Sequence, residues 1–415
     1  MTILTSTSSK INFRAFIWHS GFLALASNFM DIDTIIPSML IKAGGNSIHL
    51  GIMTAIMLGG SSLFQLVFAG FLSGKPCKKK YLLTGINLRV AALLALAVLF
   101  LTASSLSSAL IIALIFLFIS VFSFSGAFAN VSYVDILGKS VLENKRKKFF
   151  SLKQIFDSIG LISTAFIVRE LVTYFDYPKN YFVLFLIAGL LLLVASLGFW
   201  RIQEASSAVR SHKGLVDFFR MIPGEIRNNS NLKYYLLLIN TLGLTLSLMP
   251  FFILFAKDSF GLTFESVGNF LLFRTIGMLT AGIILFQFAS RFIYKHLLMF
   301  LILLGAALPL ISLTLARSAE NYHYIFILTG IFFAIYKVAL NGVLLEISTD
   351  ENRATYTGIS GAGNILTTLF PLFAGVLISA FGYYMVFLTV SAIILLSFSF
   401  VFKLDCRPVH SRSSG

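Results

Sequence analysis

Charged residues are scarce in this chain. Asp, Glu, Lys and Arg make up 12% of the 415 residues, about half the share that soluble globular proteins have. Hydrophobic residues make up 57%, and 44 residues are Phe. This composition excludes an ordinary soluble domain and predicts an all-α membrane protein with many spanning helices.

Cysteine clusters and catalytic motifs are missing as well. The two cysteines, Cys77 and Cys406, lack metal-site spacing, and we expect neither zinc nor a disulfide. The six histidines are scattered, and no Ser/His/Asp grouping or phosphate-binding glycine loop occurs. We therefore expect neither an enzyme nor a cofactor. Without an ATP site, any active transport would depend on an ion gradient.

Apolar runs long enough to cross a bilayer, about 20 residues each, recur along the chain. Twelve segments qualify: 14–38, 47–72, 80–102, 108–137, 150–173, 181–201, 233–256, 264–288, 295–315, 323–345, 357–381 and 383–402. With the N-terminus inside, 24 of the 32 Lys and Arg residues fall on the inner side and 5 on the outer side. Because positive residues concentrate in cytoplasmic loops, we predict a multi-pass protein of the cytoplasmic (inner) membrane with both termini in the cytoplasm. The basic charge thus reflects topology, and we expect no nucleic-acid partner.

The longest loop divides these twelve segments six and six. We predict an N-terminal six-helix bundle at 1–200, a cytoplasmic linker at 201–232 and a C-terminal bundle with a short tail at 233–415. The halves echo each other, since Gly51 and Gly60 in segment 2 match Gly268 and Gly277 in segment 8. Six spans return the chain to its starting side, so the two bundles run in parallel, an arrangement typical of transporters.

A lysine interrupts segment 10. Gly330, Ala334, Lys337 and Asn341 recur at helical spacing and share one face, while the other faces are apolar. A lysine near the bilayer centre costs a few kcal/mol and should face protein or water. Two interpretations stay open: this face lines a solute cavity, or Lys337 forms a structural pair with a carboxylate.

A second cation lies at similar depth. Arg274 falls about eleven residues into segment 8, or roughly 17 Å at the helical rise. Two cations at one depth repel each other unless an anion lies between them. We hypothesise that Arg274 and Lys337 bind an anionic or zwitterionic solute, and that Asp31, with Asp33 nearby, carries a coupling proton or cation. A structural pair of Asp31 with either cation is the alternative.

Small and polar residues also form stripes in segments 1, 4 and 7. Ser27 lies on the stripe of segment 1, Asn130 on that of segment 4 and Asn240 on that of segment 7. Such stripes occur at helix–helix contacts too. Their presence in four segments favours the lining of a cavity, and we predict these three residues as solute contacts beside Asn341.

The loop between segments 2 and 3 reads Gly70-Phe-Leu72-Ser-Gly74-Lys-Pro-Cys77-Lys78-Lys79-Lys80. Together with the twelve-span topology and the duplication, it resembles the Gly-x-Leu-x-Asp-x-x-Gly-Arg-Lys motif of the major facilitator superfamily, with Gly74 at the position of the acid. The resemblance covers almost the whole chain. It implies a cavity lined by helices 1, 4, 7 and 10, rocking of one half against the other, and a monomer.

Charges near the inner face form a further predicted set. Arg89 in segment 3 and Asp157 in segment 5 lie at similar depths, and Asp135 is near them. With Gly70, Lys78 and Lys79 we interpret them as a gate and charge network that stabilises the outward-open state. Asp157 as a proton carrier is the alternative.

We therefore predict a secondary active transporter that moves a small polar, anionic or zwitterionic solute by alternating access with proton coupling. Export of amphipathic or drug-like compounds is the alternative within transport, although segment 5 lacks the proline-rich signature of drug/proton antiporters. A non-transporting membrane sensor on the same scaffold is the alternative outside transport. The predicted partners are a small-molecule solute and the lipid bilayer.

Overall fold

The computed structural model describes residues 6–73, 75–141, 143–204, 215–287, 294–315, 319–348 and 353–405. Within these ranges the regular structure is helical throughout, and eight helices are long and apolar enough to cross a membrane. The predicted all-α fold of membrane-spanning helices is thus confirmed. The predicted positions Gly74 and Cys406 lie outside the described residues.

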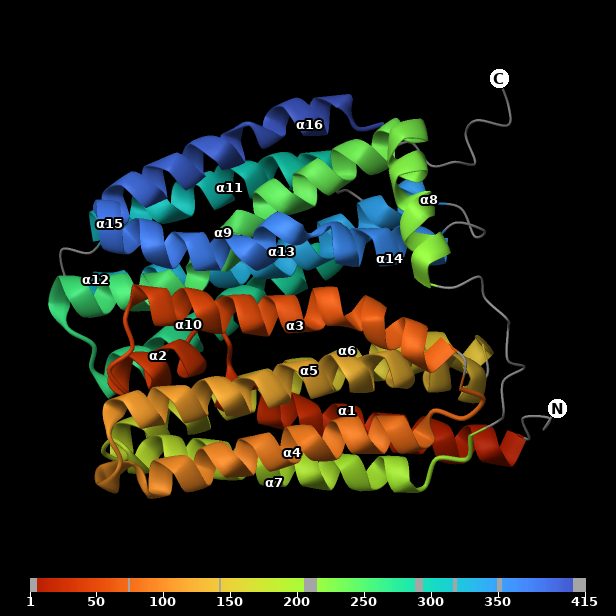
Figure 1. The fold of residues 1–415 in the computed structure, drawn as a ribbon, viewed down its shortest axis with the longest axis horizontal. Helices are drawn as coiled ribbons and strands as arrows, with labels where there is room; N and C mark the ends of the chain where they lie inside the picture. Colours follow the sequence, from red (N-terminus) through yellow and green to blue (C-terminus); the bar gives the residue numbers. More distant parts are fainter. Residues whose placement is uncertain are drawn as a thin grey trace. The chain divides into compact units, whose positions relative to one another are not determined.

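The chain forms two compact units (Figure 1). Unit 1 comprises Met1–Gly45 and Ile56–Gly214, and unit 2 comprises Asn46–Ala55 and Leu215–Gly415. The helices up to α7 are α1 (Ser6–Ser27), the 3-10 turn η1 (Asn28–Met30), α2 (Ile35–Lys42), α3 (Ser47–Ser73), α4 (Lys79–Leu101), η2 (Ala103–Ser105), α5 (Ser108–Ser140), α6 (Glu143–Tyr174) and α7 (Lys179–Trp200). The first turns of α3 belong to unit 2 and the rest to unit 1.

The later helices all belong to unit 2. They are α8 (Leu215–Asn228), α9 (Ser230–Phe260), α10 (Phe264–Gln287), α11 (Tyr294–Leu315), α12 (Ala319–Tyr322), α13 (Tyr324–Ile347), α14 (Arg353–Gly363), α15 (Ile365–Leu395) and α16 (Ser397–Lys403). A bend inside α15 separates the last two predicted spans. It occurs at Gly382, whose φ of +76° is a conformation that glycine adopts without strain.

Aromatic rings fill the core of unit 1. The ring of Phe16 meets those of Tyr133 and Phe199 edge to face, with centroids 5.0 Å and 5.4 Å away. Edge-to-face contacts of this kind add stability beyond the area they bury. They join α1, α5 and α7 and hold the first half of α1 straight.

Unit 2 has its own buried aromatic centre. Phe270 of α10 stacks on Phe326 of α13 with centroids 4.3 Å apart. The Tyr322 hydroxyl is fully buried, donates to the Phe252 carbonyl at 3.0 Å and pairs with the Ser312 hydroxyl at 2.7 Å. Because these polar groups satisfy one another, the tyrosine can lie inside an apolar bundle.

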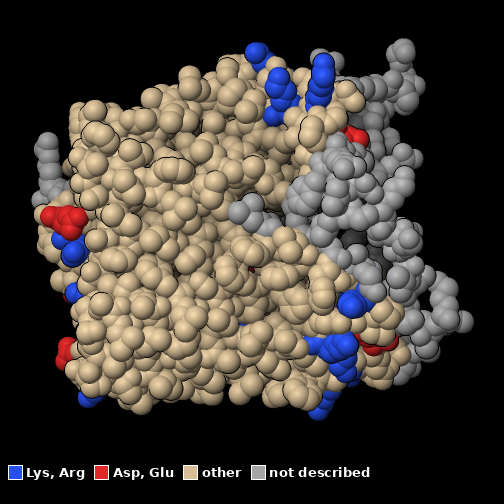
Figure 2. All heavy atoms as spheres, in the orientation of Figure 1, with Lys and Arg blue, Asp and Glu red and all other residues tan. Residues whose placement is uncertain are grey.

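One face of the molecule carries few charges between the helix ends. On the face drawn in Figure 2, Lys, Arg, Asp and Glu gather toward the helix ends, and uncharged atoms cover the stretch between them. Large apolar residues of the membrane-spanning helices are more than half exposed, among them Phe166, Leu197 and Phe373. Such a surface suits contact with lipid rather than water.

Two of the predicted spans are broken rather than continuous. Segment 14–38 consists of α1, η1 and α2, with non-helical residues at 31–34, and segment 357–381 is interrupted at Asn364 between α14 and α15. Hydropathy alone recognises apolar length and does not detect such breaks, which need specific side chains to satisfy the freed backbone groups.

Candidate functional site

Two cations of unit 2 meet at one aromatic ring. The Arg274 guanidinium of α10 lies 5.2 Å from the centre of the Phe333 ring on α13. The Lys337 ammonium, one turn after Phe333, lies 4.4 Å from the same centre. Arg274 is 5% exposed, whereas Lys337 is exposed. The face of an aromatic ring attracts cations, so Phe333 holds both charges at one place.

Glycines bring α10 and α13 together there. A Cβ added to Gly330 would lie 2.1 Å from the Arg274 carbonyl oxygen, and one added to Gly277 would lie 2.1 Å from that of Ile327. The helices therefore cross with their backbones in contact. The predicted stripe is thus divided, because Gly330 packs against α10 while Lys337 and Asn341 are exposed.

Asn240 of α9 holds the break in segment 11 together. Its Nδ2 donates to the carbonyls of Leu236, at 2.8 Å, and Gly363, at 2.7 Å. Its Oδ1 accepts from the Leu366 backbone N–H at 2.7 Å. The side chain thus caps both ends of the interruption between α14 and α15. Because its amide groups are used in this way, Asn240 acts as a structural bridge.

The rest of the predicted stripe of segment 7 also packs against α15. A Cβ on Gly243 would overlap the Thr367 hydroxyl, and the Ser247 hydroxyl donates to the Thr367 carbonyl at 2.7 Å. In this structure the stripe of segment 7 thus meets α15, and its role as a cavity lining stays a prediction. Small residues collect here because two helices approach closely, a reason that helical spacing alone does not distinguish from cavity lining.

The break in segment 1 is centred on Asp31. One of its carboxylate oxygens accepts from the Asp33 backbone N–H at 3.0 Å and from the Thr34 hydroxyl at 2.9 Å. The Asp31 carbonyl accepts from the Ile36 N–H at 3.0 Å, which starts α2. Asp31 thus organises the non-helical residues in the way that acidic side chains cap helix starts.

Neighbouring helices fix this break in place. The Asn28 amide donates to the Leu161 carbonyl at 2.6 Å and to the Thr164 hydroxyl at 3.0 Å, both on α6. On the other side, the Tyr181 hydroxyl of α7 donates to the Ser38 hydroxyl at 2.9 Å. Asp33 is 7% exposed between these two attachments. The acids are therefore held by a rigid, polar environment within the membrane segment.

Of the other predicted solute contacts in unit 1, Asn130 is exposed on α5. Ser27 is half-buried, and its hydroxyl donates to the Leu23 carbonyl at 2.8 Å, one turn earlier on α1. A serine that donates within its own helix keeps its oxygen as an acceptor. The Asn130 side chain is thus accessible, and the Ser27 hydroxyl oxygen can still accept a hydrogen bond.

Charges at the end of unit 1 that we predict to face the cytoplasm, called the inner end below, form a connected network. The Lys78 ammonium lies 2.8 Å from the Asp135 carboxylate. The Glu204 carboxylate accepts from the backbone N–H groups of Lys78 and Lys79, each at 2.6 Å. The Lys79 ammonium donates to the Trp200 carbonyl at 2.8 Å. Glu204, which follows α7, thus caps the start of α4 and ties the beginning of the linker to it.

Glu204 is a residue that the sequence analysis missed, because it lies about 125 residues from the N–H groups that it caps. Gly70 lies in α3, before this network.

Asp157 forms an ion pair with Lys153, one turn earlier on α6. Arg89 lies over the Phe122 ring at 4.3 Å. A Cβ on Gly126 would come within 3.3 Å of the Arg89 Nε, so this glycine makes room for the guanidinium.

Comparison with known proteins gives a family match. Residues 20–328 match the model of the Major Facilitator Superfamily, about three quarters of the chain. No curated protein matches the chain. The family and its solved members indicate a transporter rather than an enzyme.

Solved structures share the fold at low identity. The nucleoside transporter NupG is 12% identical, with a TM-score of 0.68 and coverage of 95% of this chain and 100% of that one. A D-xylose–proton symporter is 14% identical, with a TM-score of 0.67 and coverage of 96% and 99%. A POT family transporter in complex with 5-aminolevulinic acid is 12% identical, with a TM-score of 0.65 and coverage of 94% and 95%. At these identities the likeness concerns the fold alone.

Proposed function

Because the chain belongs to the major facilitator superfamily, we propose that it is a secondary active transporter for a small anionic or zwitterionic solute. Transport proceeds by alternating access and is coupled to protons. The nucleoside, sugar and peptide transporters that share its fold support solute transport as the general activity. The chemistry of the solute is argued from this chain's own residues.

The observation that carries the proposal is the placement of Arg274 and Lys337 around Phe333. Placing either cation in the membrane costs about 2.5–3.5 kcal/mol on insertion scales. Two cations held near one ring also repel each other, and a carboxylate or phosphate group of a solute relieves that repulsion. In this proposal Lys337 contacts the solute anion, and Arg274 reinforces the field from its buried position.

Further contacts come from neutral side chains. Asn341 is exposed one turn after Lys337, and Asn130 is exposed on α5. The Asn341 amide can donate to or accept from the polar atoms of a zwitterion beside Lys337. Within unit 1, Asn130 and Ser27 remain predicted solute contacts. Asn240 is omitted from the proposed contacts because its amide bridges the break between α14 and α15.

Proton coupling is assigned to Asp31 and Asp33. Interrupted membrane helices form ion sites in other transporters, because unwound backbone groups coordinate the ion. The break at 31–34 places two carboxylates at such an interruption. Asp157 is the alternative proton carrier, and in this structure it forms an ion pair with Lys153.

The inner-end network is proposed to stabilise one conformation of the cycle. The Lys78–Asp135 pair and the Glu204 cap hold the start of α4, the end of α5 and the start of the linker together. The positive-inside bias supports cytoplasmic termini in the cytoplasmic membrane, and the fold suggests a monomer. With that orientation the network lies on the cytoplasmic side.

The test is solute flux in vesicles reconstituted with the purified protein. An inward proton gradient is imposed, and uptake of labelled anionic, zwitterionic, neutral and cationic solutes is measured. We expect accumulation of an anionic or zwitterionic solute, abolished by a protonophore. Accumulation of lipophilic cations only would favour the export of amphipathic compounds. The absence of flux for every class would favour a sensor role.

A further inference from the structure

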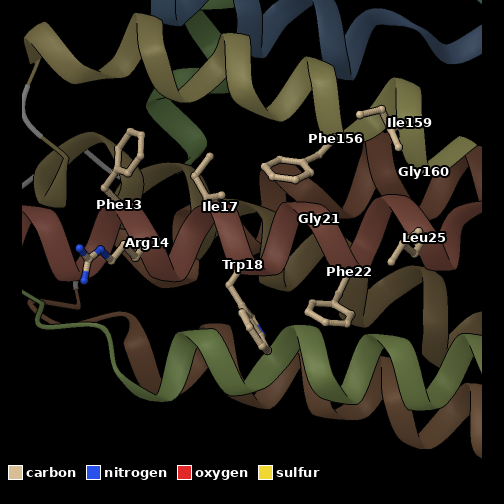
Figure 3. A pocket seen from close by; sticks show the side chains of 10 residues that line it. All are labelled: Phe13, Arg14, Ile17, Trp18, Gly21, Phe22, Leu25, Phe156, Ile159 and Gly160. Carbon is tan, nitrogen blue, oxygen red and sulfur yellow. The ribbon is translucent and has the colours of Figure 1, made fainter.

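A groove on unit 1 is not used by the proposed transport cycle. It has a volume of about 460 Å³ and lies between α1 and α6. Its size falls within the range of about 300–1,000 Å³ that small-molecule sites have. Figure 3 shows Phe156 and Ile159 of α6 above α1, while Trp18 and Phe22 extend from α1 toward α7. The groove thus lies on an accessible side of α1.

The lining is apolar along its length and basic at one end. Arg14, Trp18, Gly21, Phe22 and Leu25 come from one face of α1, at helical spacing. Arg14 is exposed and is the one charged residue among those that line the groove. Lys10, one turn earlier, is exposed as well. The indole N–H of Trp18 donates to the Val194 carbonyl at 2.7 Å, which fixes the ring beside the groove.

Glycines shape the floor of the groove. A Cβ added to Gly21 would meet the Phe156 ring in ordinary van der Waals contact, at 3.9 Å, so this ring forms the opposite wall of the groove. A Cβ added to Gly160 would lie 2.9 Å from the Ala24 side chain, so α1 and α6 touch there and close the far end. The groove is therefore bounded by Phe156 opposite Gly21 and ends near Leu25.

The length of the groove matches one membrane leaflet. Arg14 and Leu25 are eleven positions apart, which is about 16 Å along a helix. Half of the hydrocarbon core measures about 15 Å. An acyl chain that starts at the membrane surface beside Arg14 would thus reach the closed end of the groove. Its phosphate would lie beside two cations.

We propose that this groove binds an acyl chain of an anionic phospholipid, whose phosphate contacts Arg14 and Lys10. The lipid comes from the leaflet on the side of the N-terminus. An apolar channel alone accepts any acyl chain, but the two cations favour a headgroup with net negative charge. The site requires only that α1 lies in a membrane, and it does not depend on the solute or on proton coupling.

The chain supplies its own reporter for this site. It contains two tryptophans, so the substitution Trp200→Phe leaves Trp18 as the single fluorophore. We would reconstitute this variant into vesicles that contain brominated phosphatidylglycerol or brominated phosphatidylcholine and measure quenching of Trp18. We expect the anionic lipid to reach half-maximal quenching at an about 25-fold lower mole fraction, since each of the two basic residues near the surface adds about a factor of five in affinity.

Two substitutions distinguish the contribution of the headgroup contact to lipid binding from that of the acyl-chain groove. In the Trp200→Phe background, Arg14→Gln should lower the preference for the anionic lipid about fivefold. Gly21→Leu should remove the preference, because the leucine fills the groove while the charges remain. Arg201→Gln, which removes an exposed charge at the end of α7, and Gly282→Leu, at an open helical glycine of α10, are matched controls that should retain the preference.

Three outcomes would overturn the proposal. The first is equal quenching by both lipids in the Trp200→Phe protein. The second is a preference that Arg14→Gln leaves undiminished. The third is a preference that survives Gly21→Leu, which would leave only attraction of anionic lipids to a basic surface. Should Gly21→Leu fail to fold, Arg14→Gln decides alone, because Arg14 is exposed and its substitution leaves the packing intact.

Discussion

Unit 1 and unit 2 hold their membrane-embedded charges in different ways. In unit 1, Asp31 and Asp33 lie where segment 1 is broken, and the Asp31 carboxylate itself caps the interruption. In unit 2, Arg274 and Lys337 lie on unbroken helices and share the Phe333 ring. The acids are thus part of the backbone architecture, whereas the cations are side chains attached to it.

This difference suggests a division of roles. Carboxylates at an interrupted membrane helix suit an ion-coupling site, since unwound backbone groups take part in such sites. Of the two cations, Lys337 is exposed and can meet a ligand, while Arg274 is buried, which suits solute binding at Lys337. Unit 2 also has a break, at Asn364. There the neutral side chain of Asn240 forms hydrogen bonds with the backbone groups on both sides of the break. A helix break therefore does not by itself mark a coupling site.

The largest expected effect comes from Asp31→Asn. The amide keeps an oxygen that can accept from Asp33 N–H and Thr34, but it cannot bind and release a proton. We expect proton-driven uptake to fall about a hundredfold, toward the upper range of coupling between two ligands. Solute exchange without a gradient should continue. Equal loss of uptake and exchange would show that Asp31 serves structure or solute binding rather than coupling.

Asn240→Ala should have the next largest effect, on stability. It removes three hydrogen bonds and leaves backbone groups at the break without partners. Since an unsatisfied buried group costs about 1–3 kcal/mol, we expect a loss of about 2 kcal/mol in denaturant unfolding, about thirtyfold in the equilibrium. Asn231→Ala is the matched control, since Asn231 is on the same helix in an exposed contact with Asp405. Similar losses for both variants would contradict the bridging role.

Phe333→Leu tests how the cations are held. A cation–π contact contributes about 0.5–2 kcal/mol, so we expect solute affinity to fall about two- to thirtyfold, measured by ligand titration. Phe332→Leu changes the adjacent buried ring, whose centre lies 5.8 Å from that of the Tyr336 ring. It should lower stability and leave affinity unchanged. If Phe333→Leu binds solute as tightly as the wild type, the ring does not organise the site.

The smallest effect should come from the Lys78–Asp135 pair. Its side chains are 10% and 32% exposed, so solvent partly screens the interaction. A double-mutant cycle with Lys78→Gln and Asp135→Asn should give a coupling energy of about 1 kcal/mol in thermal unfolding. A coupling near zero would mean that the Glu204 cap alone holds the start of α4.

Much of the fold can be predicted from the distribution of apolar and charged residues along the chain. Apolar length and the basic loops predict the spans, and the cations at 274 and 337 are visible as interruptions of apolar runs. The break in segment 1 also has a local signal, because Asp31, Asp33 and Thr34 are helix-capping residues just before Pro37 in the first turn of α2. A proline there is tolerated at a helix start and not in a helix interior.

Other features depend on residues far apart in the chain. The bridge of Asn240 to Gly363 spans more than a hundred residues, and so does the cap of Glu204 on Lys78. The stripe around Gly243 has the same spacing as a cavity lining, yet it packs against Thr367. Helical periodicity indicates that residues share a face and leaves open what that face meets.

The most direct test of the central claim is a ligand-stability measurement on Lys337→Gln. The purified wild type and the variant are screened by thermal unfolding against anionic, zwitterionic, neutral and lipophilic cationic solutes, with Lys257→Gln as a control for loss of an exposed charge. A ligand that binds the folded protein raises its Tm. The account predicts that an anionic or zwitterionic solute stabilises the wild type and the control, and that Lys337→Gln binds it about tenfold more weakly. Equal stabilisation of Lys337→Gln, or stabilisation by lipophilic cations alone, would contradict it.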